Sequence, residues 1–233
     1  MKTIIFDTSS IISIATNELI PVFKSLKGKF NGDFIISESV KKEVIDYPLT
    51  TKKFKLEAIM LLDCLTKNYL KLYESNDVRK KAEYLLSLVN EIFKADKDYI
   101  RIVDLAEVES LTLAIYLNSE VYVVDERTMR LVIENPKQLA ELLAKKLQTK
   151  ITINNENLKK FKDEVGSVKI IRSTELMTLA YEIGLFDDLI GKNKIIKKDL
   201  RPMLLEGLLW GLKLRGCSIS QEEIDEIIKL EGF

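Results

Sequence analysis

Short apolar runs and longer stretches of helical period alternate along the chain. The runs at 3–6, 34–36, 120–124 and 168–171 predict buried strands, and 69–73 predicts a weaker edge strand. Apolar positions that recur every three to four residues predict helices. Two short helices are expected, one after residue 7 and one from near Pro21. The further expected helices cover 37–46, 52–67, 77–94, 104–118, 128–147 with a bend at Pro136, and 173–183. Ser37 or Ser39 caps the helix at 37–46, and Pro48 ends it. Strands that alternate with helices favour the α/β class, a parallel sheet in an α/β/α arrangement.

The last fifty residues have a purely helical pattern. Helices are expected mainly at 200–214 and 220–230, and Ser220 and Glu223 have the spacing of a capping box. We therefore predict an α/β domain over 1–183 and a helical extension over 184–233. The apolar stripe of the extension, which includes Trp210, either packs back onto the domain, the favoured expectation, or serves a homodimer or another protein partner.

Composition narrows the classes of chemistry. Hydrophobic residues make up 46% and charged residues 31% of the 233 residues, as in globular proteins. The chain has 36 basic and 36 acidic residues, so nucleic-acid binding would need a locally basic surface. Lysine and arginine cluster at 24–29, 79–81, 159–162 and 192–201. The absence of histidine excludes Ser-His-Asp and Cys-His triads and His-ligated zinc.

Two cysteines do not make a disulfide framework, and reduced thiols fit a cytoplasmic protein. No apolar run reaches the roughly 20 residues of a membrane span, and Asp7 interrupts the apolar N-terminal segment. The expected location is therefore cytoplasmic, without a membrane partner.

Two aspartates directly follow predicted strands. Asp7 follows the run at 3–6 and Asp125 follows the run at 120–124. The carboxyl ends of parallel strands form the ligand crevice of an open sheet, so both are candidates for a site. Taken singly, each is as readily explained as a helix N-cap or a turn residue.

Two glutamates lie on apolar helical stripes. Glu43 shares a face with Val40 and Tyr47, and Glu107 heads the stripe that continues at Leu111. Glu43 can also be a stripe-edge residue that reaches water, and Glu107 can simply cap its helix. Glu109 lies on a more mixed face, either supporting the site or solvated.

Four carboxylates from separate segments repel one another unless a cation joins them. Oxygen ligands without histidine or cysteine suit Mg²⁺ or Mn²⁺. Convergence of these acids would therefore predict a divalent-metal site.

The residues around these acids resemble the four motifs of the PIN-domain nucleases, in family order. The motifs are a strand that ends in Asp7-Thr8-Ser9, the segment 37–44 with Glu43, the segment 106–114 with Glu107 and Glu109, and the strand end 123–127 with Asp125. The chain departs from the compact VapC-like toxins by a longer helical stretch between the second and third motifs and by the C-terminal extension.

The resemblance implies a metal-dependent nuclease that cleaves RNA, less often DNA. By this reading Asp7, Glu43, Glu107 and Asp125 hold one or two Mg²⁺ or Mn²⁺ ions and are the catalytic acids. Ser9, Glu109 and Glu126 are supporting residues, and Arg127 and Arg130 either hold substrate phosphate or form ordinary surface pairs.

Two other functions stay open. A catalytically silent nucleic-acid or protein binding module would keep the same fold. A Mg²⁺-dependent phosphatase of the haloacid-dehalogenase type is less favoured, because Ser9 occupies the place where that chemistry needs a second aspartate. Neither a P-loop nor a dinucleotide-binding glycine motif is present.

Overall fold

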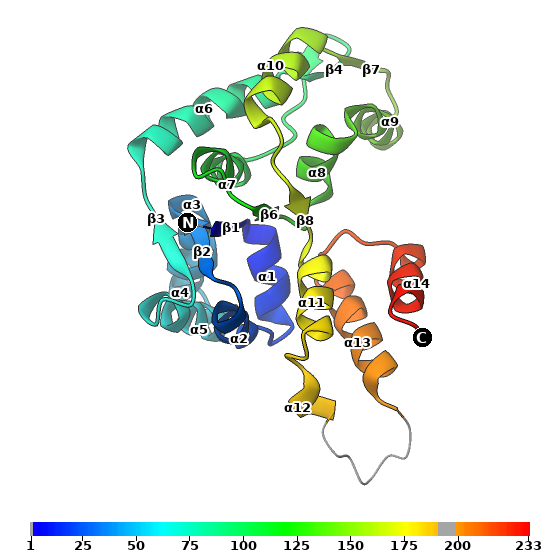
Figure 1. Ribbon diagram of the computed structural model, residues 1–233. Coiled ribbons are helices and arrows are strands. Elements are labelled where there is room, and N and C mark those ends of the chain that lie inside the picture. The colour runs from blue at the N-terminus through cyan, green and yellow to red at the C-terminus, as the bar shows by residue number, and fades with distance from the viewer. Residues whose placement is uncertain (1, 191–198) are drawn as a thin grey trace.

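The centre of the molecule is a five-stranded parallel sheet (Figure 1). The computed structural model describes residues 2–190 and 199–233. The strands are β1 (Lys2–Phe6), β2 (Gly32–Ser37), β3 (Lys71–Tyr73), β6 (Val121–Val123) and β8 (Ile170–Ile171), in the order β3-β2-β1-β6-β8. Every neighbouring pair is parallel. The α/β prediction is confirmed, and the weakly predicted strand near residue 71 is the edge strand β3.

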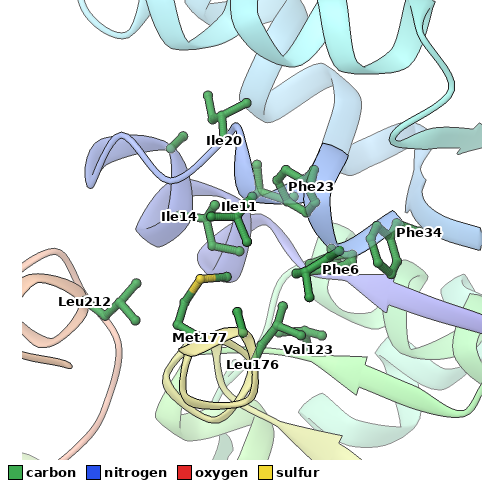
Figure 2. Packing of buried hydrophobic residues seen from close by; sticks show 14 of the residues in the cluster. Phe6, Ile11, Ile14, Ile20, Phe23, Phe34, Val123, Leu176, Met177 and Leu212 are labelled. Atoms are coloured by element: carbon green, nitrogen blue, oxygen red, sulfur yellow. The ribbon is translucent and has the colours of Figure 1, made fainter. Parts of the chain in front are cut away.

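Helices cover both faces of the sheet. Successive strand residues point to opposite sides, and apolar residues on both sides need to be buried. Ile4 and Phe6 of β1 lie in one core cluster, whereas Ile5 lies in the other. The first cluster is covered by α1 (Thr8–Thr16), α2 (Val22–Lys29), α5 (Lys55–Thr66), α11 (Ser173–Glu182) and α13 (Arg201–Leu214). Figure 2 shows Phe6 and Phe34 facing Phe23, and the rings of Phe6 and Phe23 meet edge to face at 5.2 Å.

The second core cluster lies between the sheet and the helices on its other face. These helices are α6 (Asn76–Asn90), α7 (Leu105–Tyr116), α8 (Arg127–Glu134), α9 (Pro136–Leu147) and α10 (Asn155–Val165). The predicted bend at Pro136 is the break between α8 and α9. Above this layer lies a small antiparallel sheet of β4 (Phe93–Ala95), β5 (Asp98–Tyr99) and β7 (Ile151–Ile153). This sheet and α10 were not predicted, and the helix expected to reach residue 94 ends at Asn90.

The second motif folds as three short helical segments. Ser37 caps α3 (Glu38–Lys41) through its hydroxyl, which accepts the Val40 N–H at 3.3 Å. A π-helix, η1 (Lys42–Asp46), follows and leads into α4 (Tyr47–Thr50). The expectation that Pro48 ends the helix is wrong, because proline is tolerated in the first turn of a helix and Pro48 lies there in α4.

The C-terminal helices pack back onto the sheet layer. Those that pack there are α13 and α14 (Gln221–Leu230), and α13 lies beside α11 (Figure 1), whereas α12 (Asp187–Ile190) has no buried residue. Leu205, Leu209 and Leu212 are fully buried in the first cluster. The capping box of Ser220 and Glu223 is confirmed.

Residues 192–198 of the basic segment 192–201 lie outside the described residues, and the boundary at 183/184 falls between α11 and α12. Over residues 2–190 and 199–233, no helix is long and apolar enough to cross a membrane.

Candidate functional site

Asp7 lies fully buried at the carboxyl edge of the central sheet. Its backbone N–H donates to the Val123 carbonyl at 2.9 Å, which ties the end of β1 to β6. Asp7 is also the N-cap of α1, and its Oδ2 accepts the N–H and the hydroxyl of Ser9 at 3.0 and 2.6 Å. Its Oδ1 is buried and has no hydrogen-bond partner in the described part of the chain. A buried carboxylate oxygen without a partner is costly and therefore calls for a functional explanation.

Ser9 joins this carboxylate to the strand end that carries the fourth motif. Its hydroxyl oxygen accepts the backbone N–H groups of Asp125 and Glu126 at 3.0 and 3.3 Å while its proton goes to Asp7. The side chain of Ser9 thereby fixes Asp7 Oδ2 and leaves Oδ1 free.

Glu43 approaches Asp7 from the second motif. Its Oε2 accepts the hydroxyl of Thr8 at 2.6 Å, and its charge contributes to the raised pKa of Asp7. The side chain is exposed, and the predicted stripe with Tyr47 is wrong, since Tyr47 is 69% exposed. The reason is the π-helical turn, in which the Tyr47 N–H donates to the Lys42 carbonyl five residues back and so shifts the side-chain phase.

Glu107 is the third acid near Asp7. It lies half-buried in the first turn of α7, and its Oε2 accepts the Asp104 N–H at 2.7 Å. The capping role considered from the sequence is therefore present. Burial raises the pKa of Glu107 to about 8, helped by the charges of Asp7 and Glu126, while the Asp104 N–H opposes the shift.

Glu126, expected only as a supporting acid, belongs to this group. It is the N-cap of α8, its Oε2 accepts the Met129 N–H at 2.7 Å, and its charge raises the pKa of Glu107. We name Asp7, Glu43, Glu107 and Glu126 the carboxylate cluster. Each member keeps one oxygen that makes no hydrogen bond within the described residues.

Asp125 has a different environment from the one expected for it. It is fully buried, and its two oxygens accept the backbone N–H and the hydroxyl of Ser173 at 2.7 and 2.6 Å. Its charge contributes to the raised pKa of the Cys217 thiol, where burial is the larger cause. Asp125 thus anchors the start of α11, and no sequence pattern indicates Ser173 as its partner.

Glu109 is also committed elsewhere. It is buried and forms an ion pair with Arg79 at 2.8 Å, and it accepts the Ser39 hydroxyl at 2.7 Å. These contacts join α7 to α3 and α6. The alternative that Glu109 is solvated is wrong, because the side chain is buried and paired with Arg79.

The two candidate phosphate-binding arginines line a cavity of about 520 Å³. Arg127 is exposed, and Arg130 donates to the Ser218 carbonyl at 3.2 Å while its Nε lies 3.9 Å from Glu134. The cavity also involves residues of α13 and of the turn before α14.

No group of three or more His, Cys, Asp and Glu side chains within the described residues is arranged to hold a metal ion as it stands. The side chains of Glu107 and Glu126 fold back onto the N–H groups that they cap. The cluster is therefore a set of neighbouring carboxylates, two of which also act as helix caps.

Burial raises the pKa of Asp7 from 3.8 to about 6, against the hydrogen bonds from Ser9 and with help from Glu43. A carboxyl whose folded pKa lies above its unfolded value favours the folded state below the unfolded pKa, and this advantage is lost as pH rises through the folded pKa. We expect Asp7→Asn, in chelator, to gain stability relative to the wild type between pH 4 and pH 7.5. The expected gain is about 2–3 kcal/mol, since one pKa unit corresponds to about 1.4 kcal/mol.

Urea unfolding at both pH values measures this difference. Asp98→Asn, which removes the carboxylate of an exposed aspartate in β5, is the control for the loss of one negative charge. If the free energies of unfolding of the wild type and Asp7→Asn differ by the same amount at both pH values, the raised pKa of Asp7 is contradicted.

Comparison with known proteins identifies no family. No protein-family model matches the sequence, and no curated protein matches it. Among solved structures, a chain of the crystal structure of VapBC2 from Rickettsia felis bound to a DNA fragment from their promoter aligns with a TM-score of 0.42 and 14% sequence identity. The alignment covers 74% of this chain and 98% of that chain.

Proposed function

We propose that this protein is a metal-dependent nuclease that hydrolyses RNA phosphodiesters at the carboxylate cluster. The observation that carries the proposal is Oδ1 of Asp7, a fully buried carboxylate oxygen at the carboxyl edge of a parallel sheet that has no hydrogen-bond partner among residues 2–190 and 199–233. Ligands of open α/β sheets bind at this edge. The four PIN-like sequence motifs supply the expectation that the ligand is a metal and that the substrate is RNA.

The donor set of the cluster fits a hard divalent cation. Asp7, Glu43, Glu107 and Glu126 each have one carboxylate oxygen free of hydrogen bonds within the part of the chain that the structure describes. Carboxylate oxygens are the ligands that Mg²⁺ and Mn²⁺ prefer. The geometry favours Glu126 over Asp125 as the fourth acid, since both oxygens of Asp125 already bind Ser173.

The electrostatics of the cluster point in the same direction. The pKa values of Asp7 and Glu107 rise to about 6 and about 8 because burial and neighbouring carboxylates disfavour their charged forms. A cation between the carboxylates removes this repulsion and keeps both residues ionised.

The protein's own residues would hold and orient such a site. Ser9 fixes Asp7 through Oδ2, and Thr8 fixes Glu43 through Oε2, so that both are attached to the first turn of α1. The hydroxyl of Tyr122 donates to the Glu107 carbonyl at 3.2 Å and fixes the start of α7 against β6. When bound, Mg²⁺ or Mn²⁺ supplies a Lewis acid that activates water and stabilises the charge that develops on the phosphodiester.

A cleavage assay tests the proposal. Full-length protein is incubated with end-labelled single-stranded RNA, hairpin RNA and DNA of matched sequence over a Mn²⁺ titration. RNA cleavage that requires the metal and stops in chelator is the expected result. Failure to cleave any of these substrates, with Mn²⁺ bound to the protein, would overturn the nuclease function.

A silent binding module is the second candidate, and one observation favours it. Glu107 and Glu126 both accept backbone N–H groups as helix caps, which gives each a structural role without any metal. Metal-independent RNA binding without cleavage would support this alternative.

Metal binding should also stabilise the fold. We expect saturating Mn²⁺ at pH 8 to raise the melting temperature of the wild type by several degrees, because a ligand present at 100 times its Kd contributes about 2.7 kcal/mol. Asp7→Asn should lose most of this increase, whereas Asp98→Asn should retain it. The measurement is differential scanning fluorimetry in chelator and in Mn²⁺, and identical increases for the wild type and Asp7→Asn would count against binding at the cluster.

A further inference from the structure

The cavity beside α8 has a wall made by the C-terminal helices. Arg127, Arg130 and Leu131 line it from α8, Lys213 lines it from α13, and the turn 218–220 closes it before α14. The C-terminal helices are therefore part of this cavity rather than a separate appendage.

The charges that line the cavity are mainly positive. Three of the lining residues are cations, Arg127, Arg130 and Lys213, and one is an acid, Glu223. Glu223 is already engaged, since Oε1 accepts Arg172 Nη1 at 2.8 Å and Oε2 accepts the Ser220 N–H at 2.7 Å. Burying an anion among these cations would thus gain attraction without displacing a strong internal pair.

Two of the three cations have no carboxylate partner over residues 2–190 and 199–233. Lys213 donates its ammonium to the Ile219 carbonyl and lies 5.7 Å from the ring centre of Trp210, and Arg127 forms no ion pair. Arg130 reaches Glu134 only at 3.9 Å, and its Nη1 donates to the Ser218 carbonyl. Unpaired cations that converge on one cavity are typical of a phosphate site.

The position of the cavity links it to the carboxylate cluster. Arg127 directly follows Glu126 in the chain. The Ser218 N–H donates to the Asp125 carbonyl at 3.2 Å, and Arg172 Nη1 donates to the Ser218 carbonyl at 3.0 Å. These bonds hold the C-terminal turn against the strand end that carries Glu126.

We propose that this cavity binds one nucleotide of the substrate strand, with Lys213 and Arg127 as the residues that position its phosphate. The inference rests on the proposed nuclease function for the identity of the ligand. A volume of about 520 Å³ lies within the roughly 300–1,000 Å³ range of small-molecule sites and holds more than a bare phosphate ion. The C-terminal extension then serves to place the strand relative to the acids.

Binding in the absence of metal tests this role separately from cleavage. The probe is a 3′-fluorescein-labelled single-stranded 12-mer RNA, and its anisotropy is measured in chelator with full-length protein at several salt concentrations. We expect Lys213→Gln and Arg127→Gln each to raise Kd about tenfold, because hydrogen bonds to charged groups contribute about 1.5–3 kcal/mol. Each variant should also reduce the magnitude of the salt slope by about 0.7, the value for one single-strand phosphate contact.

Lys146→Gln is the matched control, because it removes one exposed positive charge from α9 outside the cavity lining. Its Kd should remain within about twofold of the wild-type value. Arg127 is exposed, so Arg127→Gln keeps the test informative if Lys213→Gln unfolds. Equal Kd values for the wild type, Arg127→Gln and Lys146→Gln would overturn the proposal.

Competition with uridine monophosphate and with inorganic phosphate identifies the ligand. Stronger competition by the nucleotide supports the proposal, and equal competition by both shows a free-phosphate site and contradicts it. The binding assay contains no metal and is therefore independent of the cleavage assay. Absence of cleavage would contradict the nuclease function but would leave the measured RNA binding unchanged.

Discussion

Asp7→Asn is expected to lower metal-dependent RNA cleavage by about 100- to 1,000-fold, the usual cost of removing one preorganised charge-stabilising group. The amide oxygen of asparagine can still accept the N–H and hydroxyl of Ser9, so the N-cap of α1 is preserved. The substitution replaces only the unpartnered Oδ1 with an amide nitrogen that cannot bind a cation. The measurement is the initial cleavage rate of the hairpin RNA at saturating Mn²⁺.

Asp98→Asn is the control for this experiment, since Asp98 is an exposed aspartate of the small sheet. It should cleave at the wild-type rate. Circular dichroism should show the same helical content in all three proteins. Cleavage by Asp7→Asn at the wild-type rate would remove Asp7 from the catalytic machinery and would leave its buried oxygen unexplained.

Asp125 and Glu126, although adjacent, are expected to respond in opposite ways. Asp125→Ala removes two buried hydrogen bonds to Ser173 and leaves the Ser173 N–H without its acceptor. We expect a loss of about 3 kcal/mol in the free energy of unfolding, since a lost charged hydrogen bond and an unsatisfied buried donor each cost about 1–3 kcal/mol. Urea denaturation followed by circular dichroism measures this loss.

Glu126→Gln should change stability by less than about 0.5 kcal/mol, the range of ordinary surface substitutions, because glutamine still accepts the Met129 N–H. Its cleavage rate should fall by about 100-fold if Glu126 is the fourth acid of the cluster. The reverse pattern, a stable and inactive Asp125→Ala with a fully active Glu126→Gln, would return the ligand role to Asp125.

The architecture could be predicted because its signals are local. Short apolar runs and helical stripes identify the strands and helices of both layers, and the strand ends place Asp7 and Asp125 at one edge of the sheet. The small sheet escaped prediction because β4 lies in the stretch where the apolar period of α6 continues, and because β5 and β7 are short and partly exposed.

The site could be predicted only in part, because side-chain partners depend on tertiary contacts. Asp125 meets Ser173 across 48 positions of sequence, and Glu109 meets Arg79 across 30. No local pattern reports such contacts, so the sequence could not show that these two acids are already paired. The π-helical turn likewise has no sequence signature, yet it turns Tyr47 away from the face that carries Val40.

The Mn²⁺ position in a crystal soaked with this ion, located by anomalous diffraction, is the most direct measurement. We expect an anomalous peak within coordination distance of Asp7 Oδ1, with oxygens of Glu43, Glu107 or Glu126 completing the ligands. A fully soaked crystal without a peak near Asp7, or with its peak on unrelated carboxylates, would contradict the metal site and the nuclease function that depends on it.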